Sequence, residues 1–225
     1  MDWPLFLEYI PALVTGVPLT MFLLVMSLAL GLLLGAGICY CRTVKIPVLS
    51  PLLSAYVSLF RGTPLLVQLF AIYFGLGQFE FIRESIAWPL LREAWFCAFL
   101  ALGLNSAAFT SEIMRGGLLG LDKGQMEAAK AFGFSHWAKL RYVILPQLLR
   151  ISIPAYSNEI ILVLKGTSLA STISLLEITG LAKKLSSKNF TPFEAFISAG
   201  IVYLVIVFSL TVLMRFLERK LNHNG

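Results

Sequence analysis

The residues of this chain that could do chemistry are a few carboxylates and amides set in long apolar stretches. Glu112 closes one such stretch, Glu159 lies near the start of another, and Asn105 and Asn158 accompany them. Ionised side chains are costly inside a membrane and usually face a cavity or a partner. We therefore expect Glu159, Asn158, Asn105 and Glu112 to be candidates for lining a cavity that favours a cation. The alternative is that both carboxylates are bridging groups that hydrogen-bond neighbouring helices near a membrane face.

A second candidate site lies where the sequence Arg61-Gly62-Thr63-Pro64 interrupts an apolar run. Thr63 suits the N-cap of a restarting helix and Pro64 suits its first turn. The free N–H groups of such a half-helix are a recurrent anion site in transporters, and Gln68 lies one turn further on. The alternative is a kink without functional meaning.

The sequence contains no recognisable set of residues for covalent catalysis. It has no G-x-x-x-x-G-K-[ST] phosphate loop, and its two histidines, His136 and His223, are in polar segments with no metal-ligand spacing. No Ser/His/Asp or Cys/His set can be assembled within the apolar stretches. We expect no catalytic residue, no metal site and no cofactor bound by this chain, so it is not expected to be an enzyme.

The elements that must position these residues are membrane helices. Of the 225 residues, 58% are hydrophobic and only 13% are charged, and the mean hydropathy is +0.82. A soluble domain carries about 25% charged residues. The composition excludes an ordinary soluble enzyme, a disordered chain and a disulfide scaffold. It predicts an all-α, polytopic membrane protein.

Five spans are predicted, in one transmembrane domain that covers residues 1–225. Each is long enough to cross about 30 Å of hydrocarbon. Gly31 and Gly35 in the first span form a small-xxx-small pattern that permits close helix packing. The fourth span is expected to be one helix that carries Glu159 and Glu177 on the same stripe. The spans cover residues 17–41, 47–78 (broken near 61–64), 95–113, 154–178 and 193–214.

The distribution of Lys and Arg predicts the orientation of the chain. Most of them fall in the connections after the first and third spans and in the C-terminal tail, with the cluster Lys183, Lys184 and Lys188 as an exception. Because cytoplasmic loops are rich in Lys and Arg, we expect a cytoplasmic C-terminus and an N-terminus outside the cytoplasm. The net charge of +6 is thus explained by orientation rather than by nucleic acid binding.

The connection between the third and fourth spans, residues 115–152, has the pattern of two helices joined by a glycine. Asp122 can cap the first helix, Gly133 can end it in the left-handed conformation, and Ser135 can cap the second. A rigid amphipathic projection of this kind suits a groove in a partner protein. The alternative is a solvated linker.

This connection carries a family resemblance. Glu127-Ala128-Ala129, then Gly133, then Val143-Ile144-Leu145-Pro146 resembles the EAA loop of ATP-binding-cassette importer permeases, with Val143 where that pattern usually has Ile. The resemblance implies that the loop docks on ATPase subunits. The residues implied in that contact are Glu127, Ala128, Ala129, Gly133, Leu145 and Pro146.

Three further segments, residues 60–68, 105–117 and 154–159, are similar to permeases for polar amino acids. Within that group the chain most resembles the permeases of histidine/lysine/arginine/ornithine and arginine importers. The resemblance implies a bacterial inner-membrane protein that imports basic amino acids. Its implied partners are a second permease (a different chain, or a second copy), two ATPases that bind ATP and Mg²⁺, and a periplasmic binding protein.

Three alternatives to basic amino-acid import remain at this point. A permease of the same family could import a neutral polar amino acid such as glutamine. The chain could also be a channel or a carrier that works without an ATPase, which the long docking loop argues against. A membrane-embedded enzyme is the third alternative, and the lack of convergent catalytic side chains argues against it.

Overall fold

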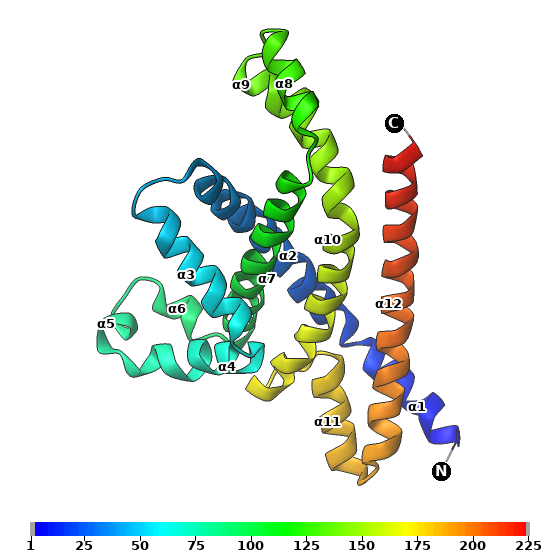
Figure 1. Cartoon of the computed structure of the whole chain (residues 1–225). Helices are drawn as coiled ribbons and strands as arrows, with labels where there is room; N and C mark the ends of the chain where they lie inside the picture. The colour runs from blue at the N-terminus through cyan, green and yellow to red at the C-terminus, as the bar shows by residue number, and fades with distance from the viewer. Residues whose placement is uncertain (1–2, 224–225) are drawn as a thin grey trace.

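The computed structural model of the chain describes residues 3–223, and every regular element within that range is helical (Figure 1). Its α-helices are α1 (Trp3–Val14), α2 (Val17–Val44), α3 (Leu49–Gly62), α4 (Leu65–Phe70), α5 (Glu80–Arg83), α6 (Trp88–Leu91), α7 (Ala94–Leu119), α8 (Lys123–Ala131), α9 (His136–Lys139), α10 (Leu145–Thr167), α11 (Ile178–Asn189) and α12 (Pro192–His223). The π-helical and 3-10 turns are Ala71–Gly75, Leu76–Gln78, Leu140–Ile144 and Ser168–Ile173.

Within residues 3–223, three helical stretches are long and apolar enough to cross a membrane, and the number rises to five if each of two bent pairs is one span. The three are Glu8–Val44, Ala94–Leu119 and Pro192–Leu221. The bent pairs are Leu49–Gly62 with Leu65–Gln78, and His136–Ile173 with Ile178–Asn189. The predicted all-α, multi-span fold is confirmed, and the break in the second span falls where the sequence placed it.

The packing of α2 against α7 forms the centre of the molecule. Gly31 and Gly35 allow it, because a Cβ atom at Gly31 would lie 2.7 Å from the Ser106 hydroxyl oxygen and one at Gly35 would lie 2.8 Å from Thr110 Cβ. The small-xxx-small pattern therefore marks a real helix contact. The core around this contact includes Cys97, which is fully buried.

The fourth span departs from the prediction of one helix through residues 154–178. Helix α10 starts earlier, at Leu145, and ends at Thr167, after which a 3-10 turn leads to α11. Glu177 is thus not on the Glu159 stripe. Its fully buried carboxylate caps α11, because it accepts hydrogen bonds from the N–H groups of Thr179 (2.9 Å) and Gly180 (2.8 Å) and from the hydroxyl of Tyr203 (2.7 Å).

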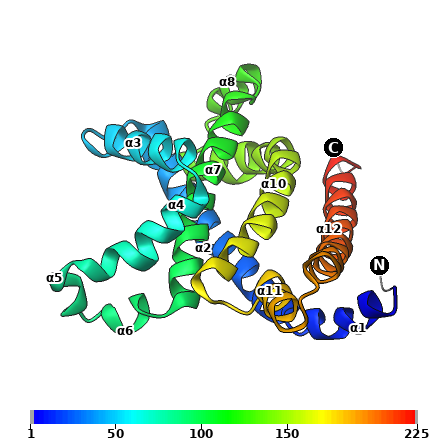
Figure 2. The same ribbon diagram turned by 90° about the horizontal axis from the view of Figure 1, so that it is seen from below.

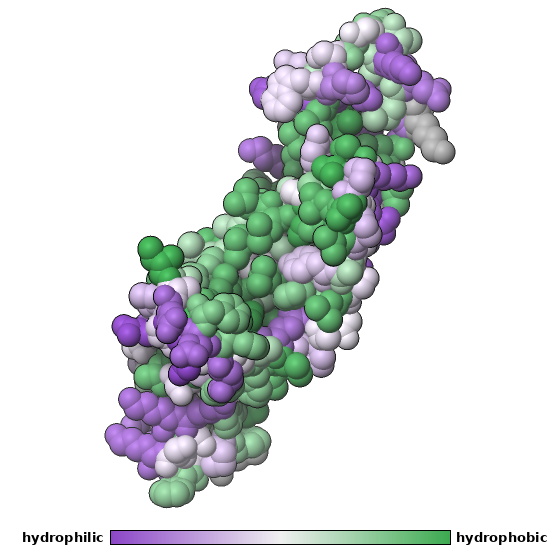
Figure 3. Space-filling view, turned by 90° about the vertical axis from the view of Figure 1, so that its left-hand side faces the viewer, coloured by the Kyte–Doolittle hydropathy of each residue, from purple (hydrophilic) through white to green (hydrophobic). Residues whose placement is uncertain are grey.

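The helices give the molecule two distinct polar ends. Helices α8 and α9 project from one end, where the C-terminus also lies, while α11 and the N-terminus lie at the other (Figure 1). Seen along the bundle in Figure 2, α7 lies between α3/α4 and α10, and α12 stands at the outside beside α10. Apolar side chains cover the middle of the face shown in Figure 3, with hydrophilic residues gathered towards the two ends. This distribution fits a protein that spans a bilayer.

Candidate functional site

A network of side-chain hydrogen bonds stabilises the break in the second span. Helices α3 and α4 meet at 110°, which leaves backbone carbonyls at the end of α3 without helical partners. The Gln68 amide donates to the carbonyl oxygens of Phe60 (2.8 Å) and Thr63 (3.1 Å) and to the Thr63 hydroxyl (2.8 Å). Gln68 is buried. Its amide therefore satisfies backbone carbonyls that the helix break leaves free.

The expected N-cap role of Thr63 is wrong. Pro64 is the N-cap of α4, while Thr63 is the C-cap of α3. The Thr63 hydroxyl donates backwards to the Leu59 carbonyl at 2.8 Å. A threonine can end a helix in this way, since its hydroxyl competes with the backbone for helical carbonyls.

Asn105 on α7 completes the network from across the interface. Its amide donates to the side-chain oxygen of Gln68 at 3.0 Å and to the Phe60 carbonyl at 3.3 Å. A tyrosine hydroxyl nearby, that of Tyr56 on α3, donates to the Leu104 carbonyl on α7 at 2.5 Å. The break is thus fixed to α7 by polar contacts on both sides of the turn.

A cavity of about 240 Å³ opens beside this network, between α3/α4, α7 and α10. Three of its lining residues are polar, namely Thr63, Asn105 and Glu159. The others are Phe60, Leu65, Leu102, Phe109, Leu162 and Val163. The structure thus brings together three of the six residues that the sequence singled out as candidates for contact with a small molecule.

Glu159 is the one carboxylate in the lining of this cavity. It is 3% exposed, and among the side chains that the structure describes no Lys, Arg or His nitrogen lies within ion-pair distance of it. A carboxylate that is buried without a cation is costly, and a cationic ligand that enters the cavity would offset that cost. The cavity can therefore bind a small cation with an apolar stem.

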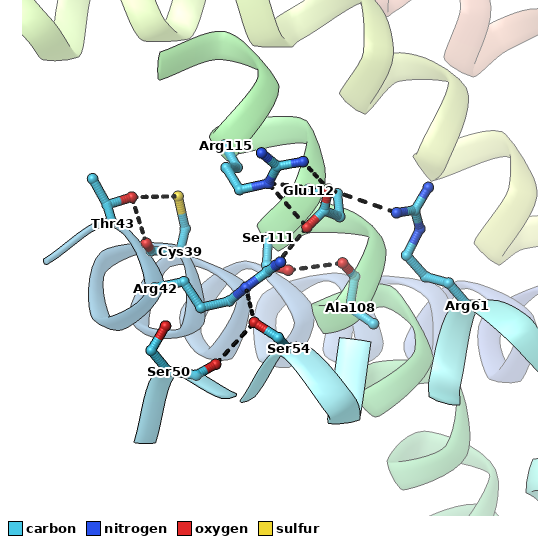
Figure 4. A network of polar contacts seen from close by, with 10 residues as sticks. All are labelled: Cys39, Arg42, Thr43, Ser50, Ser54, Arg61, Ala108, Ser111, Glu112 and Arg115. Atoms are coloured by element: carbon cyan, nitrogen blue, oxygen red, sulfur yellow. Dashed lines mark hydrogen bonds and ion pairs between the residues drawn. The ribbon is translucent and has the colours of Figure 1, made fainter. Parts of the chain in front are cut away.

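Glu112 has a different environment. Its carboxylate is shared by three arginines from three helices: Arg42 of α2 at 2.5 Å, Arg115 of α7 at 2.7 Å and Arg61 of α3 at 3.7 Å (Figure 4). Arg42 also donates to the hydroxyl of Ser54 at 3.1 Å. Three guanidinium groups around one carboxylate leave an excess of positive charge. The Glu112 carboxylate is thus a bridge between helices, and it offers little to a cation.

Asn158 lies apart from the cavity. It is exposed on α10, next to Ser157, whose hydroxyl bonds the Glu218 carboxylate of α12 at 2.9 Å. The prediction that Asn158 lines the cavity with Glu159 is not supported, because neighbouring residues of a helix point in different directions.

Two aromatic walls of the cavity, Phe60 and Phe109, were not among the predicted site residues. The Arg61 guanidinium lies 5.3 Å from the centre of the Phe109 ring. The signal for Phe109 was its spacing of four residues from Asn105, which places both on one face of α7. Phe60 begins the segment 60–68 that resembles polar amino-acid permeases, but its place in the lining depends on how α3 packs against α7 and could not be predicted from that resemblance.

The connection between α7 and α10 has the predicted helix–glycine–helix form. The Asp122 carboxylate caps α8 through the Gly124 N–H (2.7 Å), and the Ser135 hydroxyl caps α9 through the Ala138 N–H (3.2 Å). Gly133 has φ +72°, and the Phe134 N–H donates to the Ala129 carbonyl at 3.0 Å, as in a Schellman turn.

The tip of this connection presents aromatic side chains to the exterior. Phe132 is 83% exposed and Trp137 is 70% exposed. Glu127 and Ala128 are exposed on α8, whereas Ala129 is buried against the turn. Leu145 and Pro146 are exposed in the first turn of α10, which follows directly from the turn Leu140–Ile144. An exposed apolar tip on a rigid support is typical of a docking surface.

Among the residues that the structure describes, no group of three His, Cys, Asp or Glu side chains is placed to hold a metal ion.

Comparison with known proteins gives a consistent family. Residues 27–223 match the family described as "Binding-protein-dependent transport system inner membrane component". The chain is 48% identical to the octopine transport system permease protein OccM of Rhizobium radiobacter over 92% of this chain and 84% of that protein. It is 44% identical to the nopaline transport system permease protein NocM of Agrobacterium fabrum, over 99% and 92% of the two chains. It is 43% identical to the arginine ABC transporter permease protein ArtM of Escherichia coli K12, over 95% and 96%.

Solved structures agree with this relationship. A crystal structure described as an amino acid ABC transporter with histidines superposes with a TM-score of 0.86 at 33% identity, over 98% of this chain and 99% of that one. An inward-facing structure of the MetNI methionine ABC transporter shares the fold, with a TM-score of 0.76 at 18% identity over 98% and 99% of the two chains. The resemblance indicated by the EAA loop is confirmed. This chain belongs to the inner-membrane components of binding-protein-dependent transport systems, as a multi-pass permease subunit and not the ATPase of an ABC transporter.

Proposed function

We propose that this chain is a membrane subunit of an importer of basic amino acids and that Glu159 contacts the cationic part of the substrate. The observation that carries the proposal is the buried Glu159 carboxylate, which lines the cavity and has no ion-pair partner among the described side chains. A cationic substrate would supply the missing charge. The names of the relatives OccM, NocM and ArtM, which include one arginine transporter, support the same substrate class.

The other cavity residues suit an amino acid with a long cationic side chain. The rings of Phe60 and Phe109 can lie against a guanidinium or ammonium group, and the leucines can contact its methylene stem. Asn105 and Thr63 add polar groups to the same lining, and we infer that they would contact the α-carboxylate and α-amino group. Gln68 does not line the cavity, but its hydrogen bonds to Thr63 stabilise the turn that places Thr63 in the lining.

The aromatic tip of the α8–α9 loop would dock on the ATPase subunits. Phe132 and Trp137 would enter a groove there, and Glu127, Ala128, Ala129, Gly133, Leu145 and Pro146 would shape or contact the same surface. In this arrangement the α8–α9 end and the C-terminus are cytoplasmic and the N-terminal end is periplasmic. Two ATPases would bind ATP and Mg²⁺, and a periplasmic binding protein would deliver the amino acid to the other end.

A second permease, either a different chain or a second copy of this one, completes the proposed transporter. The test is uptake by the transporter of the chain's own operon, reconstituted in proteoliposomes with its binding protein. We expect ATP-dependent uptake of arginine, lysine, histidine or ornithine, with little competition from glutamine. Preferred uptake of glutamine would contradict the substrate class. Uptake without ATP would contradict the whole proposal in favour of a channel or carrier.

A further inference from the structure

An arginine borders the cavity that Glu159 lines. Arg61 is the penultimate residue of α3, and the cavity lining includes Phe60 directly before it and Thr63 two residues after it. Its guanidinium carbon lies over the ring of Phe109, 5.3 Å from the ring centre, and Phe109 is a further lining residue. The Arg61 side chain is 44% exposed. A positive charge is therefore placed at the edge of a cavity whose own charged group is negative.

The ion pair that Arg61 makes in the structure is a loose one. Its Nη1 atom lies 3.7 Å from Oε2 of Glu112, which is beyond the length of a hydrogen bond. The two carboxylate oxygens already accept shorter bonds, from Arg42 at 2.5 Å and from Arg115 at 2.7, 3.1 and 3.2 Å. Figure 4 shows Arg61 approaching from α3, on the other side of the carboxylate from these two arginines. The single charge of Glu112 is thus neutralised without Arg61.

The guanidinium of Arg61 is suited to an anion that enters the cavity. Because the side chain is half-exposed and its pair with Glu112 is loose, it can turn to another staggered rotamer. A guanidinium presents paired N–H donors that match a carboxylate in a bidentate arrangement. The polar lining residues cannot supply such a charge, because Asn105 and Thr63 are neutral and Glu159 would repel an anion. Arg61 is therefore the residue at the cavity edge that can neutralise a carboxylate.

We propose that Arg61 binds the α-carboxylate of the imported amino acid while Glu159 binds its cationic side chain. This inference rests on the proposed function and adds recognition of the group that all these amino acids share. A basic amino acid carries both charges on a short apolar stem, and this cavity has apolar walls, a carboxylate in its lining and an arginine at its edge. A ligand with the cationic side chain but no carboxylate would lose the contact with Arg61.

The experiment measures binding to the whole transporter, purified in detergent without its binding protein, so that the membrane subunits alone select the ligand. L-arginine is compared with L-argininamide, in which a neutral amide of nearly the same shape replaces the carboxylate. We expect the wild-type transporter to bind arginine roughly tenfold or more tightly than argininamide, because the amide lacks the charge that pairs with Arg61. Arg61→Gln should lower the affinity for arginine by a similar factor and leave that for argininamide nearly unchanged.

Three further variants separate recognition of the carboxylate from other effects. Arg115→Gln removes a guanidinium of similar exposure (42%) that bonds the same Glu112 carboxylate, and it should keep the wild-type preference for arginine. Glu159→Gln should weaken the binding of arginine and argininamide by the same factor, because both ligands carry the guanidinium. Arg61→Lys keeps the charge without the paired donors and should retain part of the preference.

Equal affinity of the wild-type transporter for arginine and argininamide would overturn the inference, and this comparison needs no variant. An Arg61→Gln transporter that keeps the wild-type preference would also overturn it, as would a loss of preference in Arg115→Gln as large as in Arg61→Gln. In each of these cases, arginine binding that depends on Glu159 would leave the proposed function standing. If the wild-type transporter binds neither ligand, the proposed function fails, and this inference fails with it.

Discussion

The side-chain amide of Asn105 donates a hydrogen bond to the side-chain oxygen of Gln68 at 3.0 Å, and this contact joins α7 to the break in the second span. Gln68 in turn bonds the Phe60 and Thr63 carbonyls that the break leaves free. The two amides thus make a non-helical turn stable at membrane depth, where unsatisfied backbone groups are not tolerated. The cavity wall next to Glu159 depends on this pair.

Gln68→Leu should destabilise the chain by about 1–3 kcal/mol, because the Thr63 carbonyl loses its side-chain donor while the Phe60 carbonyl keeps its bond from Asn105. Thermal unfolding in detergent measures the effect. Gln78→Leu is the matched control, because the Gln78 amide is exposed and, among the described residues, donates one hydrogen bond, to the Phe74 carbonyl at 3.3 Å. Equal losses for the two variants would contradict the role assigned to Gln68.

Gly31→Ala should destabilise the α2–α7 contact by about 1–3 kcal/mol, the usual cost of overpacking. The new methyl group would overlap Ser106, whose Cβ would be 2.8 Å away. Gly37→Ala on the same helix meets no atom within 4 Å and should be neutral or stabilising, since alanine is the better helix former. The same unfolding assay compares them, and a Gly31→Ala variant as stable as Gly37→Ala would refute the close packing.

Glu112→Gln should act on stability rather than on substrate choice. It removes the carboxylate shared by Arg42, Arg61 and Arg115. Because Glu112 and Arg42 are largely buried, the free energy of unfolding should fall by about 3 kcal/mol. Glu93→Gln breaks an exposed pair with Arg92 at 3.5 Å and should cost about 0–1 kcal/mol. In uptake assays, the relative preference among arginine, lysine and histidine should not change. A changed preference would mean that Glu112 contacts the substrate.

Trp137→Ala should reduce the amount of ATPase that co-purifies with the permease while leaving its unfolding temperature nearly unchanged. Trp137 is 70% exposed at the tip of the α8–α9 loop, so its truncation creates no cavity inside the chain. Phe81→Ala, which removes an equally exposed aromatic ring (72%) outside that loop, serves as the control and should retain the ATPase. Equal retention by both variants would place the ATPase contact elsewhere.

Local patterns in the sequence predicted several features well. Apolar runs located the spans, Asp122, Gly133 and Ser135 fixed the docking loop, and the Arg61–Pro64 sequence located the helix break. These features depend on capping groups and backbone preferences of residues close together in the chain. They could therefore be predicted without knowledge of the packing.

Other features depend on contacts between distant segments. The sequence marked Glu112 as either a cavity group or a bridge, and only the meeting of α2, α3 and α7 shows the three arginines around it. Hydropathy continued the fourth span through residue 178, whereas α10 ends at Thr167 and Glu177 caps a new helix. Helices α5 and α6 were not predicted because each has only four residues. Helix α1 was not predicted because Tyr9 and Leu13 pack against α11 and α12, which are distant in the sequence.

The central claim is that Glu159 recognises the cationic part of the substrate. The most direct measurement is ATP-driven uptake of arginine, lysine and histidine by the reconstituted transporter with Glu159→Gln, beside a check of subunit assembly. We predict that uptake of the cationic amino acids falls roughly tenfold or more, because a buried charge pair is lost, while the subunits still co-purify. Unchanged uptake of all three amino acids in an intact Glu159→Gln transporter would contradict the account.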